Sequence, residues 1–279
     1  MPNELILADD PKRIELPSPQ HDGAKLFMER AHKLTQILPD GIAARQFITS
    51  LITEVNSTAL KSCTTESVLK SAFNLTVLGL TPGAQLGHAH LVPFKTRGVA
   101  QCQVVIGYKG WLELAYGCDF LRDVQCEVVL KGEAYRRWNT IDGAQIEHEI
   151  PVDRDESWAN VQAAYCVWHS KGGGRGVSVV GKDALDKLKK RGNVWSTHPI
   201  PMAMKTALIR AAKSWQLTTR MGQAITMDDM AEAGKDQPSL SDETNDAPRP
   251  SLEAFDVESE AVEPKLADQD IPFPKESEP

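Results

Sequence analysis

The chain has 279 residues, of which 41% are hydrophobic, and its formal net charge is −7. This length allows one sizeable domain and a further segment. The five cysteines are odd in number and form no Cys-x-x-Cys pair, so neither a disulfide framework nor a zinc ribbon is predicted. No stretch is long and apolar enough to cross a bilayer and no signal-peptide pattern opens the chain, so we expect no membrane contact and a cytoplasmic location.

The charge is divided unevenly along the chain. Residues 228–279 hold sixteen Asp and Glu against four Lys and Arg, which gives this segment a net charge of −12. Because the whole chain has a net charge of −7, residues 1–227 have a net charge of +5. A segment so poor in apolar residues cannot bury enough surface to offset its ordering entropy, and we expect a disordered acidic tail at 228–279. Because prolines punctuate the start of the chain, we expect a flexible N-terminus at 1–22. The domain between them, residues 23–227, is basic, which is typical of nucleic-acid contact.

Helices are predicted in the first third of this domain. Apolar residues recur at helical spacing in 24–38 and 42–55. A third helix is expected to begin after a cap at Thr64 or Thr65, with Glu66 in its first turn, and to end at Gly79 in a left-handed conformation.

Alternating patterns then predict a run of strands. The expected strands are 86–93, 101–106, 124–130, 134–138, 145–150, 161–169 and 176–180, and the expected helices among and after them are 108–116, 183–191 and 202–217. The glycine-rich turn at 171–175 makes the last two strands a hairpin. Strands flanked by runs of helices predict an α+β fold with an antiparallel sheet.

One short pattern suggests a nucleotide site and is rejected. Residues 176–183 match the start of a phosphate loop, but Asp183 stands where a Ser or Thr hydroxyl would meet magnesium, and the intervening residues are β-branched. We interpret the segment as a strand ending at Gly181 and a helix capped by Asp183. No cofactor is predicted.

No metal site or catalytic residue is predicted either. His88 and His90 lie two apart on an expected strand and share a face, but no third ligand is visible at a suitable spacing. We interpret both as structural or facing nucleic acid. Asp153, Asp155 and Glu156 cluster in an expected loop, where acidic side chains are ordinarily solvated.

The strongest candidate for DNA contact is the basic stretch between Lys182 and Arg220, which contains nine Lys and Arg against Asp183 and Asp186. On a helical wheel, the apolar residues of 202–217 gather on one side and the basic ones on the other, so we expect a basic face open to phosphates. A solvated face is the alternative. The candidates from this stretch are Lys182, Lys189, Lys190, Arg191, Lys205, Arg210 and Lys213.

A second candidate lies between Gly107 and Gly110, where Tyr108 is expected to stack on a base and Lys109 to neutralise a phosphate. Trp111 faces the apolar stripe of the expected helix and is assigned to the core. Lys95 and Arg97, at a hairpin tip beside Phe94, complete the predicted contacts, although tip residues are often simply exposed.

Several blocks of the sequence resemble the RecT family of phage and prophage single-strand annealing recombinases. They read LGLTP at 78–82, GHAHLVPF at 87–94, VIGYKGWLELA at 105–115, WSTHP at 195–199 and MKTALIR at 204–210. The resemblance covers residues 66–217. It implies a homo-oligomer, a ring or helical filament, that binds single-stranded DNA and pairs it with its complement without ATP or a catalytic centre. It also implies a partner exonuclease and a host single-strand-binding protein.

Two other functions stay open at this point: a metal-dependent nuclease or other DNA-processing enzyme, and a passive protein that coats strands without annealing them. The acidic tail ends in a segment, 268–273, that looks like the acidic Ile-Pro-Phe tip of bacterial single-strand-binding proteins. It is interpreted as a partner-binding segment or as a merely solvating tail.

Overall fold

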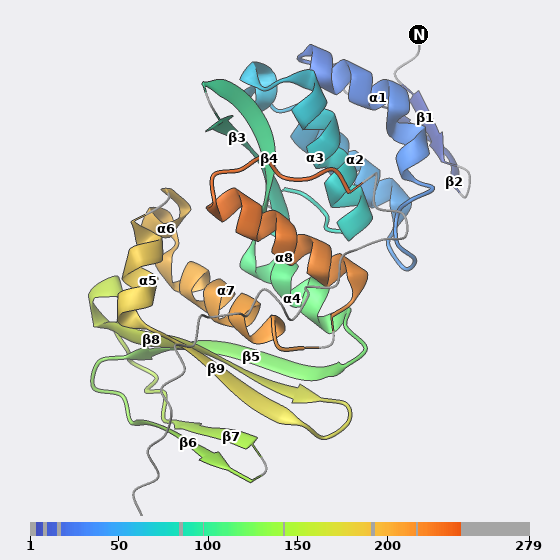
Figure 1. The fold of residues 1–279 in the computed structure, drawn as a ribbon. Helices are drawn as coiled ribbons and strands as arrows, with labels where there is room; N and C mark the ends of the chain where they lie inside the picture. The colour runs from blue at the N-terminus through green and yellow to red at the C-terminus, as the bar shows by residue number, and fades with distance from the viewer. Residues whose placement is uncertain are drawn as a thin grey trace, which may run out of the picture. The chain divides into compact units, whose positions relative to one another are not determined.

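The structure is a computed structural model that describes residues 4–7, 10–15, 18–83, 86–96, 98–141, 143–190, 193–215 and 217–240 (Figure 1). Its first helices are α1 (Asp22–Leu34), α2 (Ala44–Val55) and α3 (Thr65–Leu78), which pack against one another. The predicted ends of α3 are confirmed. The Thr64 hydroxyl accepts a hydrogen bond from the Ser67 amide at 3.4 Å, and Gly79 adopts a left-handed φ of 66°.

Two short strands precede these helices. β1 (Glu4–Leu7) pairs antiparallel with β2 (Asp10–Glu15), and Leu5 lies opposite Ile14. The segment 1–22, expected to be a flexible N-terminus, thus contains two paired strands and, at Asp22, the start of α1.

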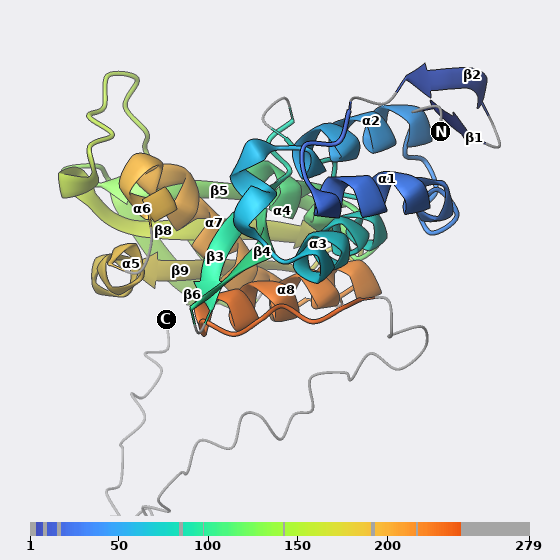
Figure 2. The same ribbon diagram turned by 90° about the horizontal axis from the view of Figure 1, so that it is seen from above.

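The middle of the chain opens with a hairpin and a helix. β3 (Ala89–Thr96) pairs antiparallel with β4 (Val99–Ile106), and α4 (Tyr108–Tyr116) follows at once. α3 packs on β4, so this hairpin lies against the N-terminal helices (Figures 1 and 2).

A three-stranded antiparallel sheet forms the centre of the second half. Its order is β5 (Leu121–Leu130), β8 (Val161–Ser170) and β9 (Arg175–Gly181). The predicted hairpin between β8 and β9 is confirmed, and its turn holds Gly173 at a φ of 86°. Between β5 and β8 the chain forms a separate antiparallel hairpin, β6 (Tyr135–Thr140) with β7 (Gly143–His148).

The two faces of this sheet are covered by different elements. Trp168 of β8 contacts Trp215, which follows α7 (Pro199–Ala212), and α7 packs along all three strands. Because side chains alternate along a strand, Tyr165 points to the opposite face. There its hydroxyl lies 3.0 Å from the His148 ring. The β6–β7 hairpin therefore lies across the sheet from α7 (Figure 1).

The remaining helices are α5 (Lys182–Lys189), α6 (Asn193–Thr197) and α8 (Thr219–Glu232). The helix expected at 202–217 begins three residues earlier and ends five residues earlier, and α8 was not predicted. None of the described helices is both long and apolar enough to span a membrane. The predicted α+β class with antiparallel pairing is confirmed.

The expected start of the acidic tail is wrong. Residue 228 lies within α8, and the described chain continues to Leu240, which is buried. Gln237 is also buried and hydrogen-bonds the backbone of Val104 in β4. The composition of this segment is acidic, but its contacts with β4 and α3 order it. Residues 241–279, including the segment 268–273, lie outside the described residues.

Candidate nucleic-acid interface

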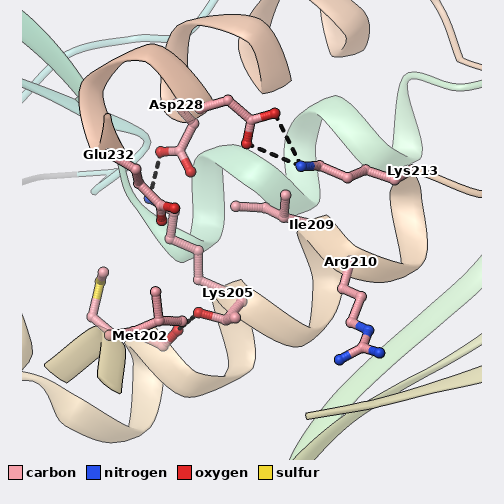
Figure 3. A pocket seen from close by; sticks show the side chains of 10 residues that line it. Met202, Lys205, Ile209, Arg210, Lys213, Asp228 and Glu232 are labelled. Carbon is pink, nitrogen blue, oxygen red and sulfur yellow. Dashed lines mark hydrogen bonds and ion pairs between the residues drawn. The ribbon is translucent and has the colours of Figure 1, made fainter. Parts of the chain in front are cut away.

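Helix α7 carries three predicted contacts, and the structure separates them. Lys205 is only 6% exposed, and its Nζ lies 2.8 Å from Oδ1 of Asp228. Lys213 is half-exposed and pairs with Asp229 at 3.0 Å. Arg210 is exposed and makes no hydrogen bond or ion pair with any other described residue. Figure 3 shows Lys205 and Lys213 reaching toward α8 while Arg210 points away from it.

The expected open basic face of α7 is therefore wrong for Lys205. The helix packs on the sheet on one side and on α4 on another, and its ion pairs Lys205–Asp228 and Lys213–Asp229 join it to α8, so Lys205 is covered. A shallow depression of about 170 Å³ remains beside α5, α7 and α8. Its charged lining is balanced, with Lys205, Arg210 and Lys213 against Asp228, Asp229 and Glu232.

Helix α5 presents the most concentrated group of predicted contacts. The ammonium groups of Lys182 and Lys189 lie 4.4 and 4.8 Å from the centre of the Trp158 ring. The Trp158 indole N–H donates to Asp186 at 2.9 Å, and Lys182 pairs with the same carboxylate, which lowers the pKa of Asp186. Lys190, at the end of the helix, is exposed. We call Lys182, Lys189, Lys190 and Trp158 the α5 cluster. Arg191 lies outside the described residues.

The α5 cluster and Arg210 are two separate basic groups. Leu188 of α5 lines the same depression as Arg210, whereas none of the α5 cluster residues lines it.

The junction between β4 and α4 differs from the expectation. Tyr108 is half-buried against the core, and burial, with a smaller contribution from Cys126, raises the pKa of its hydroxyl. A Cβ at Gly107 or Gly110 would collide with a backbone carbonyl oxygen of the segment 87–88. The glycines are therefore required for close backbone packing, and the expected exposure of Tyr108 is wrong. Lys109 is exposed, and Trp111 is fully buried, as predicted.

Lys95 and Phe94 are exposed near the turn of the β3–β4 hairpin, and Arg97 lies outside the described residues. In the register of the hairpin, Lys95 lies opposite Ala100, close to the turn. Lys109 follows the other end of the hairpin, at the start of α4. Eight strand residues span about 25 Å, so Lys95 and Lys109 are not parts of one contact.

The structure shows the conformation of the segment that matches the start of a phosphate loop. β9 ends at Gly181 as predicted, but Gly181 itself is the N-cap of α5 and Asp183 lies in the first turn, so the assignment of Asp183 as the cap is wrong. His90 lies on β3 and His88 precedes it. Within the described part of the chain, no cluster of three or more His, Cys, Asp or Glu has the arrangement of a metal site.

A basic and aromatic group that the sequence reasoning missed lies on β6. The guanidinium of Arg136 sits 4.4 Å above the centre of the Trp138 ring, and Arg137 is exposed between them in sequence. The run Arg-Arg-Trp on a predicted strand was the available signal, because alternation places Arg136 and Trp138 on one face.

Comparison with known proteins agrees with the sequence blocks. The model of the RecT family matches residues 45–246, which is more than half of the chain. The chain belongs to the RecT family. It is 30% identical over 207 residues to Protein RecT of Escherichia coli (strain K12), covering 71% of this chain and 76% of that protein. It is 27% identical over 253 residues to Uncharacterized protein YqaK of Bacillus subtilis (strain 168), covering 84% of each. The predicted family is confirmed, and with it the assignment to recombination and annealing proteins.

Proposed function

We propose that the protein is an ATP-independent single-strand annealing protein. It binds single-stranded DNA on a basic surface of a homo-oligomer and pairs it with a complementary strand during phage-type recombination. A partner exonuclease supplies the strands, and a host single-strand-binding protein is displaced from them. The protein acts without a catalytic centre, in the cytoplasm.

The observation that carries this proposal is the α5 cluster, to which the exposed Arg210 of α7 adds a second basic group. Single-strand binders combine cations that follow the phosphates with aromatic rings beside them. Lys189 and Lys190 lie at the C-terminus of α5, and Arg210 of α7 is exposed without an ionic partner among the described residues. Lys182 orients Trp158 through the shared contact with Asp186. Arg191, outside the described residues, stays a predicted contact.

Other exposed cations make secondary contacts with the DNA in the proposed function. Lys109 and Lys95 contact phosphates at separate points along the β3–β4 hairpin. Lys213 contributes after exchanging its carboxylate partner for a phosphate, since its pair with Asp229 is half-exposed and weak. Lys205 and Tyr108 are assigned to the fold.

The test combines binding, pairing and cleavage in one experiment. Purified protein is mixed with complementary fluorescent oligonucleotides, without ATP, and both pairing and chain length are followed. The expected result is faster pairing with intact strands. Coating without pairing identifies a passive binder, and metal-dependent shortening identifies a nuclease. Either result overturns the proposal.

Salt dependence then tests the location. The logarithm of the affinity for single strands should fall with the logarithm of salt concentration by about 0.7 per neutralised phosphate. Lys190→Ala and Arg210→Ala should each flatten that slope by about this amount. Lys25→Ala, an exposed lysine on α1, is the matched control and should leave the slope unchanged. Unchanged slopes in both test variants remove the α5 cluster and Arg210 from the DNA site.

A further inference from the structure

The β6–β7 hairpin carries a tryptophan in an unusual environment. The chain has six tryptophans. Five of them, Trp111, Trp158, Trp168, Trp195 and Trp215, belong to the described core or pack against it. Trp138 does not. A large aromatic ring gains most from burial, so its placement on a peripheral hairpin calls for another use of the ring.

The hairpin is fixed at its base, which gives its outer residues a defined position. The His148 ring lies 2.9 Å from the Glu133 carboxylate and 3.0 Å from the Tyr165 hydroxyl. Tyr135 contacts the same histidine edge to face at 5.8 Å. Arg154 joins Glu127 of β5 at 2.9 Å and Glu133 at 3.6 Å. These contacts attach one face of the hairpin base to the sheet.

The opposite face carries Arg136 and Trp138. The register places Glu147 directly across from Arg136, yet the guanidinium lies over the Trp138 ring, and Arg136 forms no ion pair with a described residue. Arg137, between them in sequence, is exposed, but alternation places it on the other face, that of Tyr135. Ile141, in the turn, is fully exposed.

We propose that this surface of β6, formed by Arg136 and Trp138, is a second contact for single-stranded DNA. One unpaired base stacks against Trp138 beside the Arg136 guanidinium, which also contacts a neighbouring phosphate. The proposal rests on the proposed binding of single strands and adds a separate site to it. The hairpin lies across the sheet from α7, so it is distinct from Arg210 and the depression that Arg210 lines (Figure 1).

The chemistry of the surface favours a single strand over other occupants. Stacking needs a base whose face is free, which excludes a base within duplex DNA. An indole with an arginine on it stacks on any base, so the contact is tolerant of sequence, as annealing of arbitrary strands requires. An acidic peptide would use Arg136 but leave the ring without a planar partner.

The test uses the full-length protein with Trp138→Ala, Trp138→Tyr and Arg136→Ala, and Arg30→Ala on α1 as the exposed-arginine control. Trp138→Ala should weaken binding of oligothymidine about 5- to 150-fold at every salt concentration, the range of one stacked base. Trp138→Tyr should restore most of the affinity, because a phenol ring also stacks. Arg136→Ala should weaken binding mainly at low salt, and Arg30→Ala should have no effect.

A direct readout comes from photocrosslinking. Oligothymidine containing 5-iodouracil, irradiated in complex with the wild type, should form a crosslinked peptide that contains Trp138. Affinity of Trp138→Ala within twofold of wild type, with no crosslink on β6, overturns the inference. So does a change in oligomer mass without a crosslink, which would assign the hairpin to contact with a second copy. If the wild type binds no single strands at all, the proposed function fails instead.

Discussion

The most discriminating prediction concerns Lys205, because the sequence analysis and the structure assign this residue different roles. The sequence placed it on a face open to phosphates, whereas the structure pairs it with Asp228 at 2.8 Å, with side chains only 7% and 13% exposed. Removing one partner of a buried ion pair leaves an uncompensated charge and typically costs about 3–5 kcal/mol. Lys205→Ala should therefore lose a large share of the total stability, which is about 5–15 kcal/mol in ordinary domains.

The assay is urea denaturation, with DNA affinity measured well below the transition. With a dependence of about 1–3 kcal/mol per molar urea, Lys205→Ala should lower the midpoint by roughly 1 M or more. Its folded fraction should keep the wild-type affinity and salt slope. Lys213→Ala on the same helix is the control. Its pair with Asp229 is half-exposed, so its loss should cost only about 0.2–1 kcal/mol.

A second arm separates charge from packing. Replacing both partners, as Lys205→Met with Asp228→Leu, removes both charges and keeps apolar volume, and such replacements are often neutral or stabilising. The double variant should recover most of the midpoint lost in Lys205→Ala. The reasoning is refuted if Lys205→Ala is as stable as Lys213→Ala and instead loses affinity in a salt-dependent way. The ion pair would then open in solution, and Lys205 would be a phosphate contact.

Two further predictions concern stability. A chain ending after Leu240 should melt like the full-length protein, whereas one ending after Glu232 loses the buried Gln237 and Leu240 and should melt at a lower temperature. Equal melting temperatures would show that this segment adds nothing. Burial alone would raise the pKa of Glu133, but hydrogen bonds from the Leu130 amide and His148 outweigh it and lower that pKa. A carboxylate whose pKa is lowered by folding stabilises the fold at pH values above its unfolded-state pKa. This stabilisation is lost as the pH falls through the folded-state pKa. Glu133→Gln should therefore be less stable than wild type at neutral pH, with the difference shrinking in acid; a difference that is constant across pH contradicts this.

Local signals predicted local structure well. The hydroxyl of Thr64 and the left-handed Gly79 define the ends of α3 through contacts within one or two turns, so the sequence sufficed. The same holds for the β8–β9 hairpin, whose glycine-rich turn lies between two apolar strands.

The errors arose where contacts are distant in sequence. The Lys205–Asp228 pair joins residues 23 apart on different helices, and no periodicity within α7 reveals that α8 covers it. α8 was missed because Asp228, Asp229 and Glu232 share the composition of the tail that follows. Tyr108 was misplaced because glycines beside it were interpreted as room for a ligand, when they make room for the chain's own backbone. Composition and helical wheels describe a single helix or strand, whereas the exposure of its side chains depends on the other elements that pack against it.

The outer edge of β4 bears on how copies of the chain can assemble. An unpaired strand edge is a template for strand addition. In β4 that edge is closed by side chains. The Cys102 amide donates to Ser67 Oγ, Ser71 Oγ donates to the Cys102 carbonyl, and the Gln237 amide makes two 2.8 Å hydrogen bonds to Val104.

The outer edge of β5 is closed in a similar way, though less completely. The Tyr116 hydroxyl donates to the Val124 carbonyl at 3.3 Å, and the Val128 amide donates to Glu127 at 2.8 Å. A neighbouring strand would have to displace these groups one by one before gaining a ladder hydrogen bond. Strand addition at β4 or β5 would therefore break hydrogen bonds before forming any, so the proposed homo-oligomer must assemble through side-chain surfaces or through other strand edges.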